Sequence, residues 1–201
     1  MNAIISKADI SPGDCGITML SNNKSINKTH ARVTAIGDVG ELNSWIGKLA
    51  SSINIGGMQD GFAPVLLSIQ HDLFNLEREL SNPGLESAKF SENKVKYLEG
   101  VQSALIVKLP VLQGTVLPRG HREASDAFLA QSVARRAERS VWALNYITDE
   151  EFISALFNGQ PSDTEHSHKE CARYLNRLSG FLLAYGRTIN HEAKIAETIA
   201  Y

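Results

Sequence analysis

Five segments of this chain carry apolar residues at intervals of three and four positions, the spacing that lines one face of an α-helix. Clusters of proline and glycine separate these segments into helical lengths instead of the short, evenly spaced pieces typical of a β-sandwich. The separating breaks are residues 11–27, 54–61, 81–91, 109–121 and 158–163. In the first three segments the apolar positions are Leu42, Ile46, Leu49 and Ile53, then Leu66, Ile69, Leu73, Leu76 and Leu80, then Val95, Leu98, Val101 and Leu105.

The fourth and fifth segments differ in the size of their apolar residues. The fourth has a seam of mostly small residues, which lets a neighbouring helix approach closely and predicts a central position. The fifth has a heptad-like stripe suited to shallow packing angles. These positions are Ala127, Ala130, Ala134, Ala137, Val141 and Leu144 in the fourth segment, and Cys171, Leu175, Leu178, Leu182, Tyr185 and Ile189 in the fifth. We therefore predict an all-α fold, a five-helix up-and-down bundle.

Composition excludes several classes of protein. The chain has 201 residues, 43% of them hydrophobic, which suffices for one domain with a buried core. Its net charge of −2 provides no general field that would attract nucleic acid. Cys15 and Cys171 are too few for a disulfide framework and fit a reducing compartment. The first residues lack the apolar core of a signal peptide, and no run approaches a membrane span, so we expect a cytoplasmic protein with no membrane partner.

Residues 1–30 have no apolar periodicity, so we expect a loop wrapped on the bundle formed by residues 31–201. Gly13 and Gly16 allow successive backbone N–H groups to converge on an anion, while Thr18 adds a hydroxyl and Lys28 a positive charge. These features predict a phosphate-binding arm, although an ordinary turn explains the same residues equally well. Asp14 suits such a site mainly if a cation is bound or if its carboxylate braces the loop amides.

The fourth segment carries Gln131, Arg135 and Glu138 on one polar helix face. Two interpretations remain open. Arg–Glu pairs on a solvated face are the usual meaning of such a sequence. A phosphate clamp would use the same guanidinium fork, whose planar donors match phosphate oxygens.

The fifth segment contains Asn176 and Arg177 between apolar residues, so one or both are expected to face a partly buried crevice. Asn176 would either hold a neighbouring backbone or contact a ligand. Gly180 is unexpected inside a helix, where glycine costs about 1 kcal/mol relative to alanine. The nearby Glu165, His166 and His168 lack the spacing of a metal site, so we expect no dedicated metal. Trp45 and Trp142 are predicted to be packing residues.

Taken together, five motifs resemble the PduO-type ATP:corrinoid adenosyltransferases in order and spacing. They are GDCGIT from Gly13, AIGDVGELNSWIG from Ala35, IQHDLFNLEREL from Ile69, VARRAER from Val133 and YLNRLSG from Tyr174. The resemblance covers roughly residues 13–187 and implies a homotrimer of five-helix bundles with active sites between adjacent subunits. It also implies transfer of the 5′-deoxyadenosyl group of ATP to cob(I)alamin, assisted by Mg²⁺.

The resemblance also assigns residues. In the family the N-terminal loop wraps the triphosphate, which implies this role for Gly13, Asp14, Gly16 and Thr18, with Lys28 nearby. Arg135 matches the arginine regarded as essential for the triphosphate, and Glu138 and Asn176 match further ATP-site residues, so Arg135 and Glu138 are expected to serve catalysis. Cobalt(I) is itself the nucleophile, so no protein nucleophile is expected. A reductase or a corrinoid-dependent enzyme is the implied protein partner.

Four positions depart from the family pattern. Gly40 and Gln131 replace an aspartate and an arginine that pair across the subunit boundary, and losing both partners is less costly than stranding one. Thr115 replaces a phenylalanine beside the lower corrin face, and Gly180 replaces an aspartate. These changes leave an alternative open, namely a diverged paralogue that binds ATP or a corrinoid as a regulatory or carrier module without efficient turnover.

Overall fold

The computed structural model describes residues 13–52, 60–82, 85, 88–144 and 168–200. Five α-helices account for most of them: α1 (Ala31–Ser51), α2 (Ala63–Ser81), α3 (Glu92–Ile106), α4 (Arg122–Ala143) and α6 (Lys169–Glu192). A 3₁₀ turn, η2 (Asp60–Phe62), precedes α2. The predicted all-α class is confirmed, and each helix coincides with one of the five apolar segments. Ile53 and the break at residues 158–163 lie outside the described residues.

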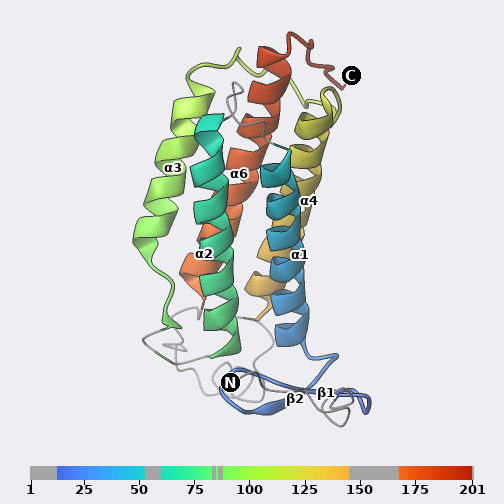
Figure 1. The fold of residues 1–201 in the computed structure, drawn as a ribbon, viewed down its shortest axis with the longest axis vertical. Helices are drawn as coiled ribbons and strands as arrows, with labels where there is room; N and C mark the ends of the chain where they lie inside the picture. The colour runs from blue at the N-terminus through green and yellow to red at the C-terminus, as the bar shows by residue number, and fades with distance from the viewer. Residues whose placement is uncertain (1–12, 53–59, 83–84, 86–87, 145–167, 201) are drawn as a thin grey trace, which may run out of the picture.

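The helices alternate in direction along the bundle axis (Figure 1). Helix α1 contacts both α2 and α4, and α6 contacts both α4 and α3. The order across the bundle is therefore α2, α1, α4, α6, α3, so α3 and α4 are consecutive among these five helices in sequence but are separated by α6 in space. No helix within the described ranges has the length and apolar content needed to cross a bilayer.

Small residues allow α4 to pack tightly between α1 and α6. Ala127, Ala130, Ala134 and Ala137 are all fully buried along its seam, as the sequence predicted. On the facing helix, a Cβ added at Gly186 would lie 2.7 Å from the ring of Phe128, so glycine permits this close approach. Trp45 and Trp142 pack against the core from its edge, in agreement with the packing role predicted for them.

The segment before α1 forms a two-stranded hairpin instead of the loop that we expected. Strands β1 (Ile17–Met19) and β2 (Ser25–Asn27) pair antiparallel, with Thr18 opposite Ile26. The hairpin lies at the lower end of the bundle (Figure 1), where the Ser21 N–H donates to Ser81 Oγ at 2.9 Å. The expectation of a loop was wrong because strands of three residues are too short to show an alternating pattern.

Residues 195–200 are held against the segment between α3 and α4 at the other end of the bundle. The Leu117 N–H donates to the Thr198 carbonyl and the Ala200 N–H donates to the Thr115 carbonyl, both at 2.8 Å. Buried Arg187 pairs with Glu197, with Nε and Oε1 2.5 Å apart, and its Nη2 donates to the Pro110 carbonyl at 2.8 Å. These contacts make residues 195–200 part of the wall at this end.

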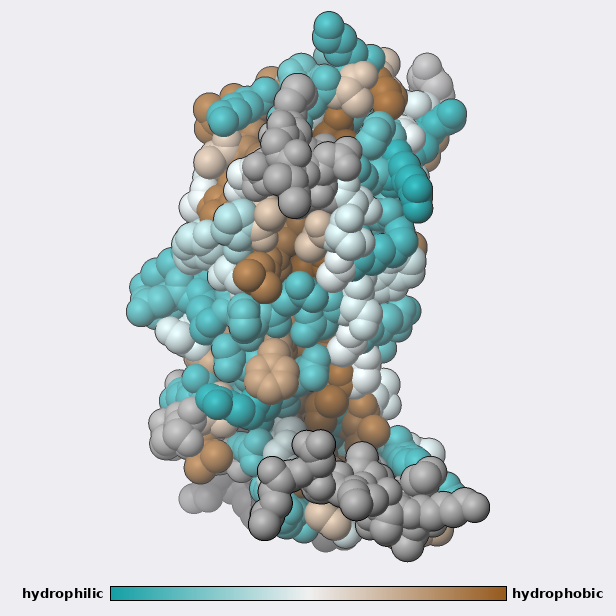
Figure 2. Space-filling view, in the orientation of Figure 1, coloured by the Kyte–Doolittle hydropathy of each residue, from teal (hydrophilic) through white to brown (hydrophobic). Residues whose placement is uncertain are grey.

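The face over α1 and α2 has apolar side chains interrupted by hydrophilic ones (Figure 2). On α2, Leu67 and Phe74 are 56% and 62% exposed. They are seven residues apart and therefore lie on the same side of the helix. This outward stripe has no partner among the described residues.

Candidate functional site

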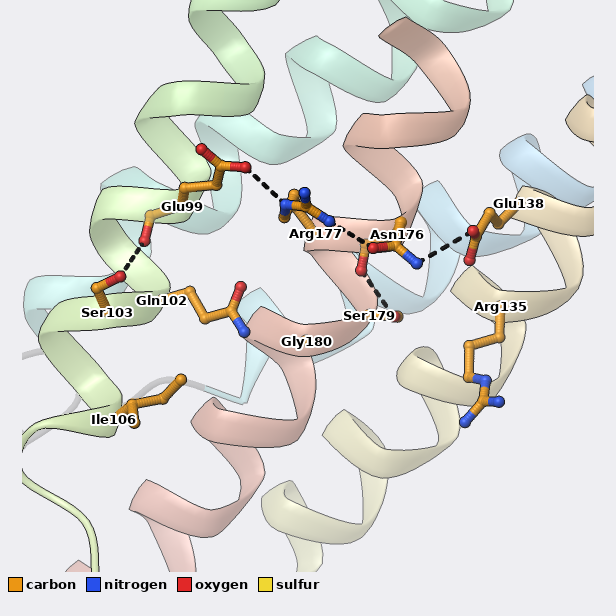
Figure 3. A pocket seen from close by; sticks show the side chains of 10 residues that line it. All are labelled: Glu99, Gln102, Ser103, Ile106, Arg135, Glu138, Asn176, Arg177, Ser179 and Gly180. Carbon is orange, nitrogen blue, oxygen red and sulfur yellow. Dashed lines mark hydrogen bonds and ion pairs between the residues drawn. The ribbon is translucent and has the colours of Figure 1, made fainter. Parts of the chain in front are cut away.

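A pocket of about 880 Å³ opens where α3, α6 and α4 lie next to one another (Figure 3). Helix α6 lies in the middle, with α3 on one side and α4 on the other. The lining residues are Glu99, Gln102, Ser103 and Ile106 of α3, Arg135 and Glu138 of α4, and Asn176, Arg177, Ser179 and Gly180 of α6. Its size and polar lining suit a ligand with several hydrogen-bonding groups.

Helical spacing explains why these residues share one pocket. Arg135 and Glu138 are three residues apart on α4, and Asn176 and Gly180 are four residues apart on α6, so each pair lies on one helix face. The structure thus brings together Arg135, Glu138 and Asn176, which were predicted as site residues on two different helical segments. Their roles toward a ligand stay predictions.

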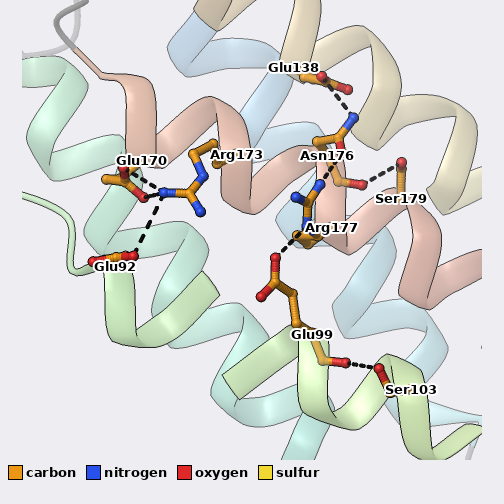
Figure 4. Close-up of polar contacts among 9 residues, drawn as sticks. All are labelled: Glu92, Glu99, Ser103, Glu138, Glu170, Arg173, Asn176, Arg177 and Ser179. Carbon is orange, nitrogen blue, oxygen red and sulfur yellow. Dashed lines mark hydrogen bonds and ion pairs between the residues drawn. The ribbon is translucent and has the colours of Figure 1, made fainter. Parts of the chain in front are cut away.

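A chain of hydrogen bonds crosses the pocket from α3 to α4 (Figure 4). Arg177 Nε donates to Glu99 Oε1 at 2.6 Å, and Arg177 Nη1 donates to Asn176 Oδ1 at 2.6 Å. Asn176 Nδ2 in turn donates to Glu138 Oε1 at 3.1 Å. Both carboxylates of the pocket therefore have a donor within the protein, and Asn176 is held by groups on either side.

Arg135 has no comparable partner for its guanidinium within the part of the chain that the structure describes. Its carbonyl accepts a hydrogen bond from Arg139 Nη1 at 3.0 Å, but its own charged group is exposed at the pocket. The neighbouring Arg136, by contrast, pairs with Asp38 and Glu41 of α1. The two interpretations of this polar face thus apply to different residues: Arg136 belongs to an ion-paired face, and Arg135 is available to an anion. Gln131 does not line the pocket.

The predicted phosphate-binding arm lies elsewhere in the chain. Gly13 and Gly16 have φ values of 118° and 80°, which confirms that these positions require glycine. The Lys28 N–H donates to the Gly16 carbonyl at 2.8 Å, and Lys28 Nζ would lie 3.1 Å from a Cβ added at Gly13. Gly13, Asp14, Gly16, Thr18 and Lys28 are all absent from the described lining of the pocket. Within one chain, the arm and Arg135 do not form one site.

Three of the four positions predicted to depart from the family pattern have different surroundings. A Cβ added at Gly180 would lie 2.5 Å from Gln102 Nε2, so the Gln102 amide fills the space beside the glycine. A Cβ added at Gly40 would lie 3.6 Å from Glu77 Oε1, which is an ordinary contact. Thr115 contributes its carbonyl to the pairing with Ala200.

Sequence reasoning missed the contribution of α3 to the pocket. Glu99, Gln102, Ser103 and Ile106 follow the helical spacing i, i+3, i+4 and i+7, on a face that adjoins the buried stripe of Val95 and Leu98. That spacing could have identified a shared face. It could not show that the face adjoins α6, because the pairing of α3 with α6 depends on the tertiary fold.

Away from the pocket, Arg32, Glu79, His168 and Cys171 form a second group, here called the Glu79 cluster. Ligand atoms of Glu79, His168 and Cys171 lie within 4.8 Å of one another. His168 Nδ1 is 2.7 Å from Glu79 Oε1, and Arg32 Nη1 is 3.2 Å from His168 Nε2. Since arginine only donates, Nε2 accepts and Nδ1 carries the proton that bonds to Glu79.

This protonation state does not suit a metal ion. Binding a metal through Nδ1 would move the proton to Nε2, where it would face the Arg32 N–H donor. Burial and the neighbouring Glu79 carboxylate also raise the pKa of the Cys171 thiol well above its ordinary value. We interpret the Glu79 cluster as a connection between α1, α2 and the start of α6. His166 and Glu165 lie outside the described residues.

The fold and the pocket define an all-α bundle protein with a polar pocket, where the guanidinium of Arg135 has no partner among the described residues; such an arrangement is suited to a phosphorylated ligand. The sequence profile of the cobalamin adenosyltransferase family matches residues 9–189. The chain belongs to this family, whose members are transferases.

Individual relatives agree with this assignment. A cobalamin adenosyltransferase from Cupriavidus metallidurans is 35% identical over 186 residues, covering 92% of this chain and 89% of the relative. A corrinoid adenosyltransferase from Bacillus subtilis is 34% identical over 187 residues, covering 92% and 87%. A variant of the PduO-type ATP:corrinoid adenosyltransferase from Lactobacillus reuteri, complexed with cobalamin and ATP, matches with a TM-score of 0.77 at 27% identity. That match covers 96% of this chain and 99% of the other.

Proposed function

We propose that this protein transfers the 5′-deoxyadenosyl group of ATP to the cobalt of a reduced corrinoid. Cobalt(I) attacks C5′ of ATP, a cobalt–carbon bond forms, the C5′–O bond breaks, and tripolyphosphate leaves with the bonding electrons. The solved relative complexed with cobalamin and ATP supports this choice of substrates. The protein's task is to hold the two substrates in line and to stabilise the negative charge on the leaving oxygen.

The observation that carries the proposal is the guanidinium of Arg135, which has no partner in the part of the chain that the structure describes. A cation aimed into a pocket whose carboxylates already have donors can give its full charge to an incoming anion. Its planar donors match the oxygens of the triphosphate. Because negative charge grows on the leaving group during the reaction, Arg135 stabilises the transition state more than the bound substrate.

Glu138 and Asn176 are proposed to hold ATP in place beside Arg135. Glu138 uses Oε1 for Asn176, and its second oxygen has no partner among the described residues. One carboxylate oxygen together with substrate phosphates is a donor set that Mg²⁺ accepts, so Glu138 would hold the ion. Mg²⁺ would supply further neutralisation of the triphosphate charge.

We propose that the phosphate-binding arm of one subunit completes the pocket of the next in a homotrimer. Ile17 and Met19 of the hairpin are 48% and 65% exposed, and they flank Thr18. Exposed apolar residues beside a predicted phosphate-binding residue are explained if this face docks on a neighbouring chain. The outward stripe of Leu67 and Phe74 on α2 offers additional apolar surface for the same assembly.

The test supplies ATP, Mg²⁺ and chemically reduced cobalamin to the purified protein and follows the corrinoid absorption spectrum. We expect conversion to the adenosylated corrinoid that depends on all three components. Absence of product would contradict the enzyme proposal. Calorimetry with ATP alone would then decide between two remaining cases. Heat of binding would support the alternative of a binding module without turnover, and no binding would indicate that the protein has no nucleotide site.

A further inference from the structure

Gln102 of α3 and Gly180 of α6 form a matched pair across the pocket (Figure 3). A Cβ at position 180 would lie 2.5 Å from Gln102 Nε2 and 3.1 Å from both Cδ and Oε1. No side chain fits there while the amide holds this place. The glycine therefore leaves room for the Gln102 amide at this place.

The Gln102 amide has no hydrogen-bond partner among the described residues, unlike the side chains of Glu99 and Ser103, which line the pocket from the same helix. Glu99 accepts from Arg177, and Ser103 Oγ donates to the Glu99 carbonyl at 2.8 Å. Gln102 is half-buried on the same helix face and lines the pocket, and its amide offers an NH2 donor group and a carbonyl acceptor. A half-buried amide without a partner is costly unless water or a ligand satisfies it.

Gln102 and Arg135 come from opposite walls of the pocket, from α3 and α4, with α6 between them (Figure 3). One wall thus offers a neutral donor and acceptor, and the other offers a positive charge. A nucleotide has the complementary division into a neutral nucleoside and an anionic phosphate chain. The hydroxyls and base edges of a nucleoside are groups that a glutamine amide can bind with both its donor and its acceptor.

We propose that Gln102 binds the nucleoside part of the nucleotide, that Arg135 binds its phosphates, and that Gly180 keeps the space that the amide needs. This inference rests on the proposed function, because it takes ATP as the ligand. It gives Gly180 a role in ligand binding, namely to make room for the Gln102 amide.

Calorimetry with two probes, ATP and inorganic tripolyphosphate, tests whether Gln102 binds the nucleoside and Arg135 the phosphates. Tripolyphosphate keeps the phosphate chain and lacks the nucleoside. We expect Gln102→Leu to weaken ATP binding about five- to tenfold and to leave tripolyphosphate binding unchanged. Arg135→Gln should weaken both. The matched control is Gln113→Leu, since Gln113 is exposed and lies outside the pocket.

A second variant approaches the same amide from the other helix. Gly180→Ala should displace Gln102 and weaken ATP binding by a similar factor, while the double variant should be no weaker than Gln102→Leu alone. Unchanged ATP binding in Gln102→Leu, or equal losses for both probes, would overturn the inference. If the unaltered protein binds neither probe, the proposed function itself fails, so the two failures are distinguishable.

Discussion

Arg135 and Arg136 are adjacent in the sequence but have opposite environments. Arg136 points toward α1, where Asp38 and Glu41 accept its hydrogen bonds. Arg135 lies on the pocket side of α4, where no described residue pairs with its guanidinium. A helix turns by about 100° per residue, so neighbouring side chains face different surroundings. The pair therefore offers a matched comparison between a binding and a structural arginine.

Replacing Arg135 with glutamine should lower kcat/KM for adenosyl transfer by about 10²–10³-fold, because a preorganised cation is lost from the transition state. Thermal stability should change little. Arg136→Gln is the control and should do the reverse, lowering the free energy of unfolding by roughly 0.5–1 kcal/mol with activity nearly retained. Steady-state kinetics and urea titration measure both. An unfolded Arg135→Gln chain would show that the residue is structural.

Glu79 is a partly buried carboxylate whose titration is linked to stability. Desolvation by itself would raise the pKa of its carboxyl, but hydrogen bonds from His168 and from the Phe90 N–H outweigh burial and hold the pKa below its ordinary value. A carboxyl with a lowered folded-state pKa binds fewer protons when folded than when unfolded. Its stabilising contribution is therefore complete above the unfolded pKa and is lost as the pH falls through the folded pKa.

Glu79→Gln should consequently reduce the free energy of unfolding at pH 7 and lose this effect in acid. The difference from the unaltered protein should shrink as the pH falls below about 4.3, the ordinary pKa of glutamate. Urea titrations at several pH values between 3 and 7 measure it. Glu92→Gln, at an exposed carboxylate, serves as the control and should show a much smaller dependence. A constant difference across this range would contradict the argument.

At the scale of elements, α4 determines how closely the bundle packs. Its alanine seam contacts α1 on one side and α6 on the other. Ala134 is fully buried, whereas Ser132 on the same helix is exposed. Protein interiors are close-packed, so such a seam has no room for larger side chains.

Ala134→Leu should therefore destabilise the protein by about 1–3 kcal/mol through overpacking. Ser132→Leu introduces the same side chain on the exposed face and should change stability by less than about 0.5 kcal/mol. Urea denaturation monitored by circular dichroism compares the two. Equal effects of both variants would show that α4 is not packed as tightly as described.

The sequence predicted the elements better than the contacts between them. Spacings such as Leu66, Ile69 and Leu73 identified the helices because a buried stripe must repeat with the helical period. The hairpin that pairs Ile17 with Asn27 was not predicted, because its strands of three residues are too short to show an alternating pattern. The α3 side of the pocket was not predicted for a different reason. Helical period fixes which residues share a face, but packing decides which helix that face meets.

At the scale of the whole molecule, the phosphate-binding arm and the pocket lie in separate parts of one chain. The hairpin is attached to the end of α2 through Ser21 and Ser81. Arg135 lies on α4, in the pocket that α4 forms with α6 and α3. A complete nucleotide site therefore needs two chains if the arm takes part.

Mixing two inactive variants tests this arrangement. Arg135→Gln removes the cation from the pocket, and Gly16→Val disables the arm, because a β-branched residue is strained at a φ of 80°. If each arm serves a neighbouring pocket, random mixed trimers at equal ratio should recover about one quarter of the activity. Each protein alone, denatured and refolded in the same way, is the control. No recovery would mean that the arm does not act across chains.

The anchoring of residues 195–200 links positions far apart in sequence. Arg187 joins Glu197 to the Pro110 carbonyl, and the backbone of residues 198 and 200 pairs with the segment around Thr115. A substitution of Glu197 would therefore also loosen the segment around Thr115, even though the two positions are far apart in the sequence.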